Sequence, residues 1–392
     1  MFTLIIFILI LGLLVLVHEF GHFITARKSG MKVYEFGFGF PPRAFGVYKD
    51  PETGKFVWVW GKGKSSLKKT VSGTENKEDF GFPSTIYSFN WLPLGGFVRI
   101  KGENGEDANE PDSFGYQKAW KRIVVLVSGV TMNIVLAGVL LSFGFMVGLP
   151  TDLSAGKDDS AIIVQEPQVL VQMISKDSPA EIAGIKFGDM ILQIDETKIV
   201  SSEQMVGYVR ENNDRDLNVV VNRNGEELSF SVRPEIVKNG EANARLGVML
   251  VDATIIRYPW YIALYKGFIA AFWGFINIFV TFYYLIKYLI LGQGLVYDVS
   301  GPVGIAKIVG DSARLGISYL INITAMLSLS LAVINILPIP ALDGGRILFI
   351  LIEKIIRRPV PMKYEQIAHM VGFVLLMVLI VVVTARDVVG LF

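Results

Sequence analysis

The chain contains no cysteine among its 392 residues, which excludes disulfide bonds and cysteine-ligated zinc sites. Histidine is almost as scarce, because the whole sequence holds three: His18, His22 and His369. The net charge is +1, so bulk charge gives no indication of a nucleic-acid partner, and we expect none. Any site that uses nitrogen ligands must therefore be built from a very small set of side chains.

Apolar residues are abundant instead. They make up 52% of the chain and the mean hydropathy is +0.48, whereas 19% of the residues are charged. This balance indicates a membrane protein with sizeable aqueous parts. The apolar run from Phe2 to Val17 follows no basic segment and precedes no small-residue cleavage site, so we interpret it as a retained transmembrane helix rather than a signal peptide.

That first helix carries the motif His18-Glu19-Phe20-Gly21-His22. Residues four apart share one face of a helix, so both imidazoles can reach one metal ion, and Glu19 can deprotonate a water bound to that ion. Most matches to this pattern are ordinary helix surface. Inside an apolar helix, however, ionisable groups are costly and are usually functional, so we expect a Zn²⁺ site with Glu19 as catalytic base.

Zinc in a catalytic site needs a third protein ligand and an open position for water. With no further suitable histidine, we expect a carboxylate, and Asp343 is the best candidate. It follows an apolar helix that Pro338 and Pro340 end, and Gly344-Gly345 would then let the chain turn sharply. We predict that His369, in contrast, is an ordinary interfacial histidine.

The fold class that we predict is an α-helical membrane protein with four transmembrane helices, a membrane-associated β-hairpin or sheet region, and one extracytoplasmic PDZ-like α+β domain. The expected divisions are 1–29 (first spanning helix), 30–118 (cytoplasmic β region), 119–150 (second helix), 151–257 (PDZ domain), 258–316 (outer-surface segment), 317–345 (third helix), 346–365 (cytoplasmic segment) and 366–392 (fourth helix and tail).

Within the β region, the residues 36–40 and 56–60 alternate with period two and predict strands, and the residues 62–77 predict a flexible loop. The residues 87–100 are too broken by glycine and proline to span a membrane. They predict a hairpin that dips into the interface or lines a cavity walled by protein. The residues 103–112 predict an acidic, solvated loop.

Topology constrains the pairing of the motifs. Arg27, Lys28 and Lys32 follow the first helix, which puts its end and the histidines on the cytoplasmic side of the membrane. If the apolar residues 258–291 crossed the membrane once, Asp343 would emerge on the opposite side and could not meet His22. We therefore predict that this segment lies on the outer surface or dips in and back.

Several motifs together resemble the site-2 proteases, in particular the RseP type of bacterial intramembrane metalloprotease. The HEFGH sequence at 18–22, the residues 335–345 (NxLPxPxLDGG), the residues 300–305 (SGPxGI) and the residues 91–103 all match this family. The residues 178–191 resemble the signature of a PDZ domain. In the second helix, Val130 stands where the family usually has proline, which leaves any kink there open.

The resemblance implies that His18, His22 and Asp343 bind Zn²⁺ and that Glu19 is the catalytic base. It also implies that Asn335 helps to position the substrate or the transition state. Gly95 and Gly96 are further candidates for substrate binding, whereas Asn133 in the second helix is as well explained by helix packing.

By the same resemblance, the protein lies in the bacterial cytoplasmic (inner) membrane and cleaves transmembrane segments of single-pass proteins, such as anti-sigma factors or signal-peptide remnants. The PDZ domain would bind a peptide or substrate, or act as a filter. The alternative is a membrane scaffold without catalytic activity, in which the PDZ domain binds partners and the metal is structural. A transporter is disfavoured because no paired broken helices recur in two halves.

Overall fold

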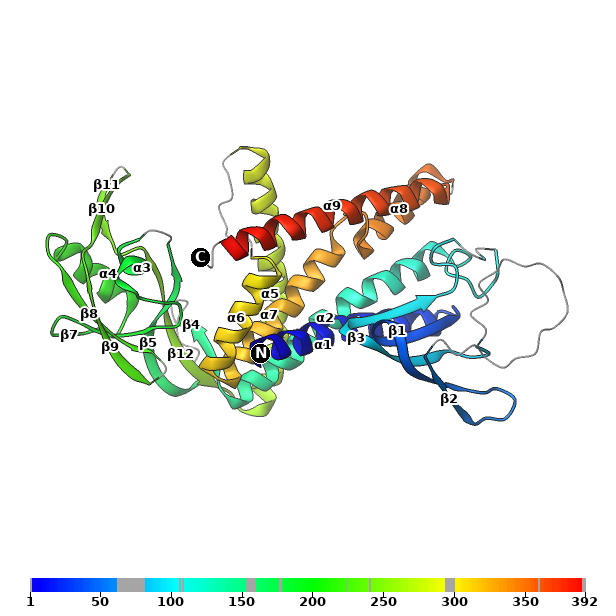
Figure 1. The fold of residues 1–392 in the computed structure, drawn as a ribbon, viewed down its shortest axis with the longest axis horizontal. Coiled ribbons are helices and arrows are strands. Elements are labelled where there is room, and N and C mark those ends of the chain that lie inside the picture. Colours follow the sequence, from blue (N-terminus) through cyan, green and yellow to red (C-terminus); the bar gives the residue numbers. More distant parts are fainter. Residues whose placement is uncertain are drawn as a thin grey trace. The chain divides into compact units, whose positions relative to one another are not determined.

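The computed structural model describes residues 2–61, 82–105, 107, 109–152, 160–175, 178–223, 225–239, 241–292, 300–358 and 360–389 (Figure 1). The predicted loop 62–77 lies outside these residues. The chain divides into two compact units. The first comprises Met1–Gly138, Ile269–Gly310 and Thr324–Phe392, and the second comprises Val139–Phe268 and Asp311–Ile323.

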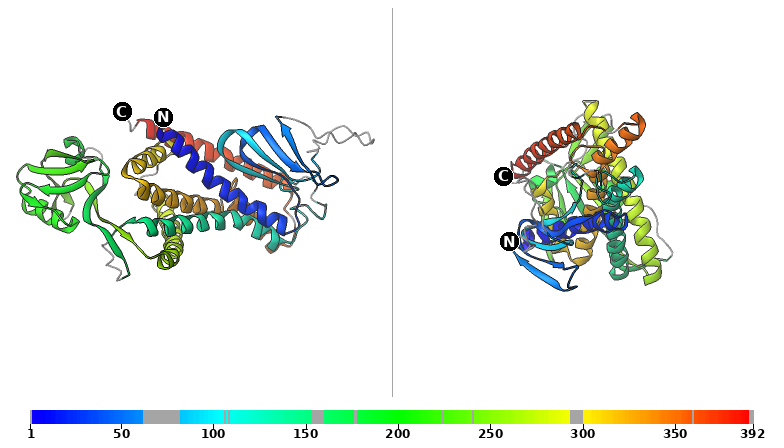
Figure 2. Two further views of the ribbon diagram at one scale, coloured as in Figure 1. Left: turned by 90° about the horizontal axis from the view of Figure 1, so that it is seen from below. Right: turned by 90° about the vertical axis from the view of Figure 1, so that its right-hand side faces the viewer.

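Among the described residues, five helices are long and apolar enough to cross a membrane by length and composition: α1 (Phe2–Lys28), α2 (Ala119–Val147), α5 (Trp260–Ile290), α7 (Ile317–Ile336) and α9 (Met362–Val389). Four of them correspond to the predicted spanning helices, and α5 covers most of the segment predicted not to cross. Within the first unit, the α5 residues 269–290 run crosswise to α1 and α9 in Figure 1, and Figure 2 (left) shows α5 nearly end on.

Helices α1 and α2 pack closely because glycine leaves room at their crossing. A Cβ atom on Gly21 would lie 2.4 Å from the carbonyl oxygen of Ser128. The Thr25 and Ser128 hydroxyl groups, 2.7 Å apart, form a hydrogen bond across the same contact. Small residues on both helices thus allow the close contact.

The β region forms one sheet from β1 (Val33–Lys49), β2 (Phe56–Trp60) and β3 (Ile86–Ile100), in the order β2-β1-β3. The two strands predicted at 36–40 and 56–60 are confirmed. The hairpin predicted within 87–100 is wrong, because its two parts do not pair with each other. Phe36 of β1 pairs with Val98 on one side and with Tyr87 on the other, so β1 lies between the two parts of β3.

This arrangement leaves the residues 96–100 of β3 at the edge of the sheet, against α1. A Cβ atom on Gly95, whose φ is +137°, would lie 2.9 Å from the Val15 side chain, and one on Gly96 would lie 3.3 Å from Leu16. The absence of side chains at both positions therefore lets the strand approach the helix that carries the histidines.

A core of buried side chains joins α1, the sheet, α2 and α8 (Asp343–Ile356). Its members are Phe23, Ala26, Met31, Val33, Ile100, Phe114, Val125, Leu126 and Ile350. Because these elements bury one common set of apolar residues, the segments that carry the candidate site residues are fixed against one another.

The turn between α7 and α8 differs from the prediction. The residue in the left-handed conformation is Ala341, with φ +84°, and Gly344 and Gly345 belong to the first turn of α8. Both glycines are buried, and a Cβ atom would lie 2.1 Å from the Leu337 carbonyl oxygen at Gly344 and 2.4 Å from the Ile339 carbonyl oxygen at Gly345. Glycine is required here for close packing, so the expectation of a sharp glycine turn is wrong.

The second unit contains a seven-stranded sheet with the order β4-β12-β5-β6-β8-β9, to which β7 is added by pairing with β6. The strands are β4 (Leu149–Asp152), β5 (Ile162–Ile174), β6 (Met190–Ile194), β7 (Thr197–Lys198), β8 (Leu217–Arg223), β9 (Glu226–Val232) and β12 (Val248–Arg257). The sheet and the short helices α3 (Pro179–Ala183) and α4 (Ser202–Glu211) enclose a core that includes Val169, Ile191, Leu217 and Met205.

Three further elements were not anticipated from the sequence. The strands β10 (Glu235–Asn239) and β11 (Glu241–Arg245) pair as a separate ribbon, and α6 (Pro302–Leu315) begins within the SGPxGI motif. In the first unit, the Asp387 carboxylate on α9 accepts hydrogen bonds from the backbone N–H groups of Gly301 (3.2 Å) and Gly304 (2.7 Å). A carboxylate therefore satisfies amide groups at the start of α6.

Candidate metal centre

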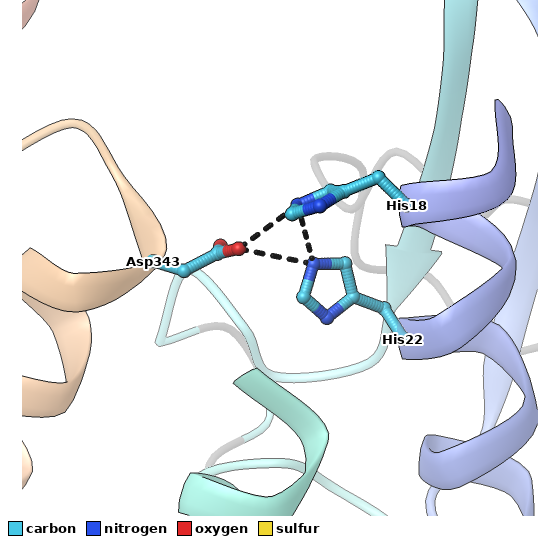
Figure 3. Close-up of side chains that lie close together, drawn as sticks. All are labelled: His18, His22 and Asp343. Atoms are coloured by element: carbon cyan, nitrogen blue, oxygen red, sulfur yellow. Dashed lines mark hydrogen bonds and ion pairs between the residues drawn. The ribbon is translucent and has the colours of Figure 1, made fainter. Parts of the chain in front are cut away.

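The two histidines of the motif point in the same direction from α1 (Figure 3). Both are buried, and their rings meet edge to face with centroids 4.8 Å apart. Their Nε2 atoms lie 3.2 Å from each other. The helical spacing of four residues is what aligns these nitrogen atoms, as the sequence predicts.

Asp343 comes from the opposite side, at the first position of α8 (Figure 3). Its Oδ2 atom lies 3.0 Å from Nε2 of His18 and 3.2 Å from Nε2 of His22. The N-terminus of α8 stabilises a negative charge at this position, since the first backbone N–H groups of a helix have no partner within the helix. Residues 325 positions apart in the sequence thus meet at one point.

The imidazole of His22 is oriented by a backbone group of α2. Its Nδ1 atom donates a hydrogen bond to the carbonyl oxygen of Val125 at 2.8 Å, which assigns the proton to Nδ1 and leaves the lone pair of Nε2 facing Asp343. A backbone carbonyl on the far nitrogen is a common way for proteins to orient a histidine that ligates a metal ion.

His18 has a similar partner in Asn133, which is fully buried in α2. The side-chain nitrogen of Asn133 is assigned 3.3 Å from Nδ1 of His18, while its buried oxygen has no hydrogen-bond partner among the described residues. Exchanging the two ends of the amide lets Nδ1–H of His18 donate to that oxygen. The lone pair of His18 Nε2 then also faces Asp343.

The donor set fits a zinc ion. Two imidazole nitrogens and a carboxylate are a ligand combination found in catalytic zinc sites, and bonds of about 2.0 Å in a tetrahedron place donor atoms about 3.3 Å apart. The observed separations of 3.0 to 3.2 Å are close to that value. Gly129 keeps the space beside the donors free, since a Cβ atom there would lie 2.5 Å from Nε2 of His22.

Glu19 lies next to these donors and is held by the edge of the sheet. Its Oε2 atom accepts a hydrogen bond from the backbone N–H of Val98 at 3.2 Å. Glu19, His22, Val98 and Asp343 line one cavity of about 260 Å³. The cavity is large enough to admit water and part of an extended peptide.

An ion pair between Arg346 of α8 and Glu103 lines the same cavity. Burial opposes the charge of Arg346, but the carboxylates of Glu103 and Asp343 raise its pKa above the ordinary value, so the guanidinium stays charged. Glu103 was predicted to belong to a solvated acidic loop, so its place in the cavity wall corrects that prediction. Arg346 was missed because a single arginine after an apolar segment has no distinctive signal.

Of the three residues predicted to bind substrate, one lines the cavity. Gly96 lines the cavity, whereas Gly95 packs against Val15 and is not part of the lining. Asn335, in the last turn of α7, is half-buried and is also absent from the residues that line this cavity. The backbone N–H of Val98 and the glycine at position 129 could not be identified as site groups from their side chains.

The chain resembles known proteins over most of its length. A family model described as Peptidase family M50 matches residues 6–55 and 78–379. The chain belongs to peptidase family M50.

Relatives of this M50 peptidase resemble it along its whole length. The regulator of sigma-W protease RasP of Bacillus subtilis is 31% identical, with 100% of this chain and 99% of that protein covered. A putative zinc metalloprotease of Clostridium perfringens is 32% identical over 96% of this chain and 95% of that protein. The zinc metalloprotease RasP of Oceanobacillus iheyensis is 30% identical, with both chains fully covered.

A solved PDZ domain, from the SdrC-like protein of Listeria monocytogenes, matches 23% of this chain and 95% of that chain, with 22% identity and a TM-score of 0.21. Family membership and the full-length relatives make this chain a zinc-dependent metallopeptidase of the site-2 protease type, and a bacterial membrane protein with several apolar helices.

Proposed function

We propose that this M50 peptidase hydrolyses peptide bonds of membrane-spanning segments at a centre formed by His18, His22, Asp343 and Glu19. The observation that carries the proposal is the convergence of three zinc-type donor atoms, within 4.8 Å of one another, beside a carboxylate at the edge of a strand. His18, His22 and Asp343 would hold Zn²⁺, which lowers the pKa of a water molecule and polarises a carbonyl group.

Residues of the protein would then transfer the protons and orient the metal ligands. Glu19 accepts a proton from the attacking water and later passes it to the leaving nitrogen, so a single carboxylate acts first as base and then as acid. The N–H of Val98 holds this carboxylate at the cavity. Val125 and Asn133 hold the two imidazoles with their Nε2 lone pairs turned inward.

The substrate would bind in an extended form along the residues 96–100 of β3. A helical membrane segment satisfies its own backbone hydrogen bonds, so it must unwind before its peptide bonds can be attacked. An edge strand can add a further strand by backbone hydrogen bonding, which would replace the lost bonds. Gly96, which lines the cavity, allows a peptide backbone to approach closely there.

The same proposal includes the topology expected from the sequence, with four crossing helices and with α5 lying on the outer surface of the membrane or dipping in and back. The basic residues Arg27 and Lys28 in the last turn of α1 support a cytoplasmic position for the centre. The crosswise direction of α5 residues 269–290 in the first unit supports the absence of a crossing (Figure 1).

We propose that residues 151–257, in the second unit, form a PDZ-like domain outside the cytoplasm that binds a peptide or the substrate. Its antiparallel sheet with two short helices supports this assignment, as does the signature at 178–191. Substrates would be single-pass membrane proteins, such as anti-sigma factors already cleaved outside the membrane or the remnants of signal peptides.

The test uses a single-pass membrane protein expressed together with the protease. We expect Glu19→Gln to lower cleavage by about 10²-fold to 10⁴-fold, the usual contribution of a general base, while zinc stays bound. Asp343→Asn should lower both cleavage and zinc content. Cleavage by the Glu19→Gln variant at the wild-type rate, or an unchanged zinc content in the Asp343→Asn variant, would refute the assignment of these roles.

The rival, a scaffold with a structural metal, is less well supported. A structural zinc site is usually closed by four protein ligands, and the described residues supply three. A scaffold would also give no reason for Glu19 to lie in the cavity beside the donors. Zinc binding without any proteolysis, under conditions in which the membrane partner is captured, would favour the scaffold.

A further inference from the structure

The third histidine of the chain, His369, contacts the loop that carries Asp343. It lies on α9, a helix that is apolar and faces outward along most of its length. Its Nδ1 atom accepts a hydrogen bond from the backbone N–H of Ala341 at 2.8 Å. Three residues further along α9, Gly372 approaches the same loop so closely that a Cβ atom would lie 2.3 Å from the carbonyl oxygen of Pro340.

The backbone at Ala341 is strained. Its φ of +84° lies in the left-handed region, which residues other than glycine adopt at a cost and keep only when their surroundings hold them there. Ala341 stands two residues before Asp343, and Leu342 between them is extended and makes no side-chain capping bond to α8. The direction in which Asp343 leaves this loop therefore depends on the conformation of Ala341.

No helix or strand satisfies the N–H of Ala341, so the bond to His369 is what pairs it. The other imidazole nitrogen, Nε2, is buried and has no hydrogen-bond partner among the described residues; its nearest carboxylate, on Glu365, is 3.8 Å away. The single hydrogen bond that the His369 ring makes is thus directed at the loop of Asp343.

We propose that His369 is a positioning residue for the metal centre, which holds Ala341 in its left-handed conformation and thereby places the Asp343 carboxylate against His18 and His22. The inference rests on the proposed function, in which Asp343 is a metal ligand. A purely structural role for His369 would predict a loss of thermal stability in its variants, with the zinc affinity of the folded protein unchanged.

The experiment measures zinc affinity by competition with a chelator, on the purified full-length protein in detergent. His369→Leu removes the acceptor and leaves the N–H of Ala341 unpaired. His369→Asn retains an acceptor, because the Asn oxygen is attached to the same Cγ position as Nδ1 of histidine. Removing a group that orients a metal ligand typically lowers the metal affinity 10-fold to 100-fold. We therefore expect His369→Leu to lower the zinc affinity by that amount and His369→Asn to lower it by less than about threefold.

Met370→Leu, an apolar exchange at an exposed position of α9, is the matched control and should leave the affinity unchanged. If the leucine variant cannot be purified, His369→Gln replaces it, since its oxygen lies one bond further from the backbone and cannot reach the same point. Wild-type affinity in the variant that lacks the acceptor, or an equal loss in His369→Asn, would overturn the proposal.

Asp343→Asn, measured in the same assay, separates the two levels of inference. If this variant binds zinc as tightly as the wild type, the proposed metal centre itself is wrong. If it loses zinc while His369→Leu does not, the centre stands and the positioning role of His369 is refuted.

Discussion

At the scale of single residues, the candidate metal centre depends on positions that carry no side chain. Gly21 lets α1 lie against the backbone of α2, and Gly129 leaves the space into which the imidazoles of His18 and His22 project. A protein interior is close-packed, so a methyl group at either position must displace something. At Gly129 the atoms that would be displaced belong to the candidate ligands themselves.

We therefore predict that Gly129→Ala weakens zinc binding by at least about tenfold, a typical effect of disturbing the surroundings of metal ligands. The reason is steric, since the new Cβ atom would lie 2.5 Å from Nε2 of His22 and 2.7 Å from Cε1 of His18. Chelator competition gives the affinity. Gly207→Ala on α4, where nothing lies within 4 Å, is the matched control, and equal affinity in the two variants would contradict the prediction.

Asp195, in the second unit, gives a prediction about pH. Its carboxylate accepts hydrogen bonds from the N–H of Asn218 and the hydroxyl of Tyr208, both at 2.9 Å, and the bond from Asn218 is the main reason that its pKa is lowered. Since the folded pKa lies below the unfolded value near 3.9, the stabilisation is complete above that value and is lost as the pH falls through the folded pKa.

We expect Asp195→Asn to destabilise the unit by about 1 kcal/mol at pH 7, and the difference from wild type to shrink as the pH falls below the unfolded value near 3.9 and through the lowered folded pKa. Urea midpoints from circular dichroism of the full chain in micelles report this difference, because the apolar helices stay folded there. A difference that is the same at pH 7 and pH 3 would show that the charge of Asp195 is not responsible.

The sequence predicted the side chains that gather at the site far better than the backbone groups. His18, His22, Glu19 and Asp343 carry chemistry that their neighbours do not, so they can be recognised. The N–H groups of Val98 and Ala341 belong to residues with unremarkable side chains, and only the tertiary structure gives them a role. The hydrogen bond of His369 could not be predicted for a related reason, since its partner is a backbone group 28 residues away.

At the scale of elements, α1, α2, α7 and α9 were predictable because long apolar runs have few alternatives in a membrane protein. The strand β3 was not, because pairing depends on contacts between segments far apart in the chain. Pro93 and Gly95-Gly96 indicate a break, but they do not show that β1 lies between the two parts of β3. The helix α6 was missed because glycine and proline at 301–304 indicate a turn, whereas Asp387 from α9 binds the amide groups there.

A substitution at the edge of β3 can distinguish the role of the Val98 backbone N–H from that of the Val98 side chain. Val98→Pro removes the N–H that holds Glu19 and removes no bond to β1, since this N–H points away from the sheet. We expect cleavage to fall by about 10-fold to 100-fold, part of the contribution of a general base, with zinc retained. Val98→Ala keeps the N–H and should stay close to the wild-type rate; an equal loss in both variants would assign the effect to the side chain.

At the scale of the whole molecule, five helices in the described part of the chain have the length and composition required to cross a membrane. The two motifs can meet only if the number of crossings between His22 and Asp343 places both on one side. By hydropathy alone, α5 would be taken as a membrane-spanning helix. The requirement that two distant motifs share a site is therefore stronger evidence on topology than the composition of any one helix.

Because the chain has no cysteine, single cysteines can report the topology directly. Introduced at the exposed positions Val200, Trp260 and Leu291, they should all react with a membrane-impermeant maleimide added from outside, whereas a cysteine at Lys28 should react only after the membrane is permeabilised. Protection of Leu291 together with labelling of Trp260 would mean that α5 crosses the membrane and would contradict the proposed arrangement.

The proposed pairing of the substrate with β3 also bears on how such an enzyme would choose its substrates. Backbone N–H and C=O groups are the same in every residue except proline, which has no N–H, so hydrogen bonds to a strand edge distinguish little between sequences. What it can distinguish is a segment whose backbone is free from one whose backbone is already bonded within a helix. Selection at β3 would therefore be conformational: the free energy of unwinding a membrane helix, set by its glycine, proline and polar residues, would decide which segments are cut.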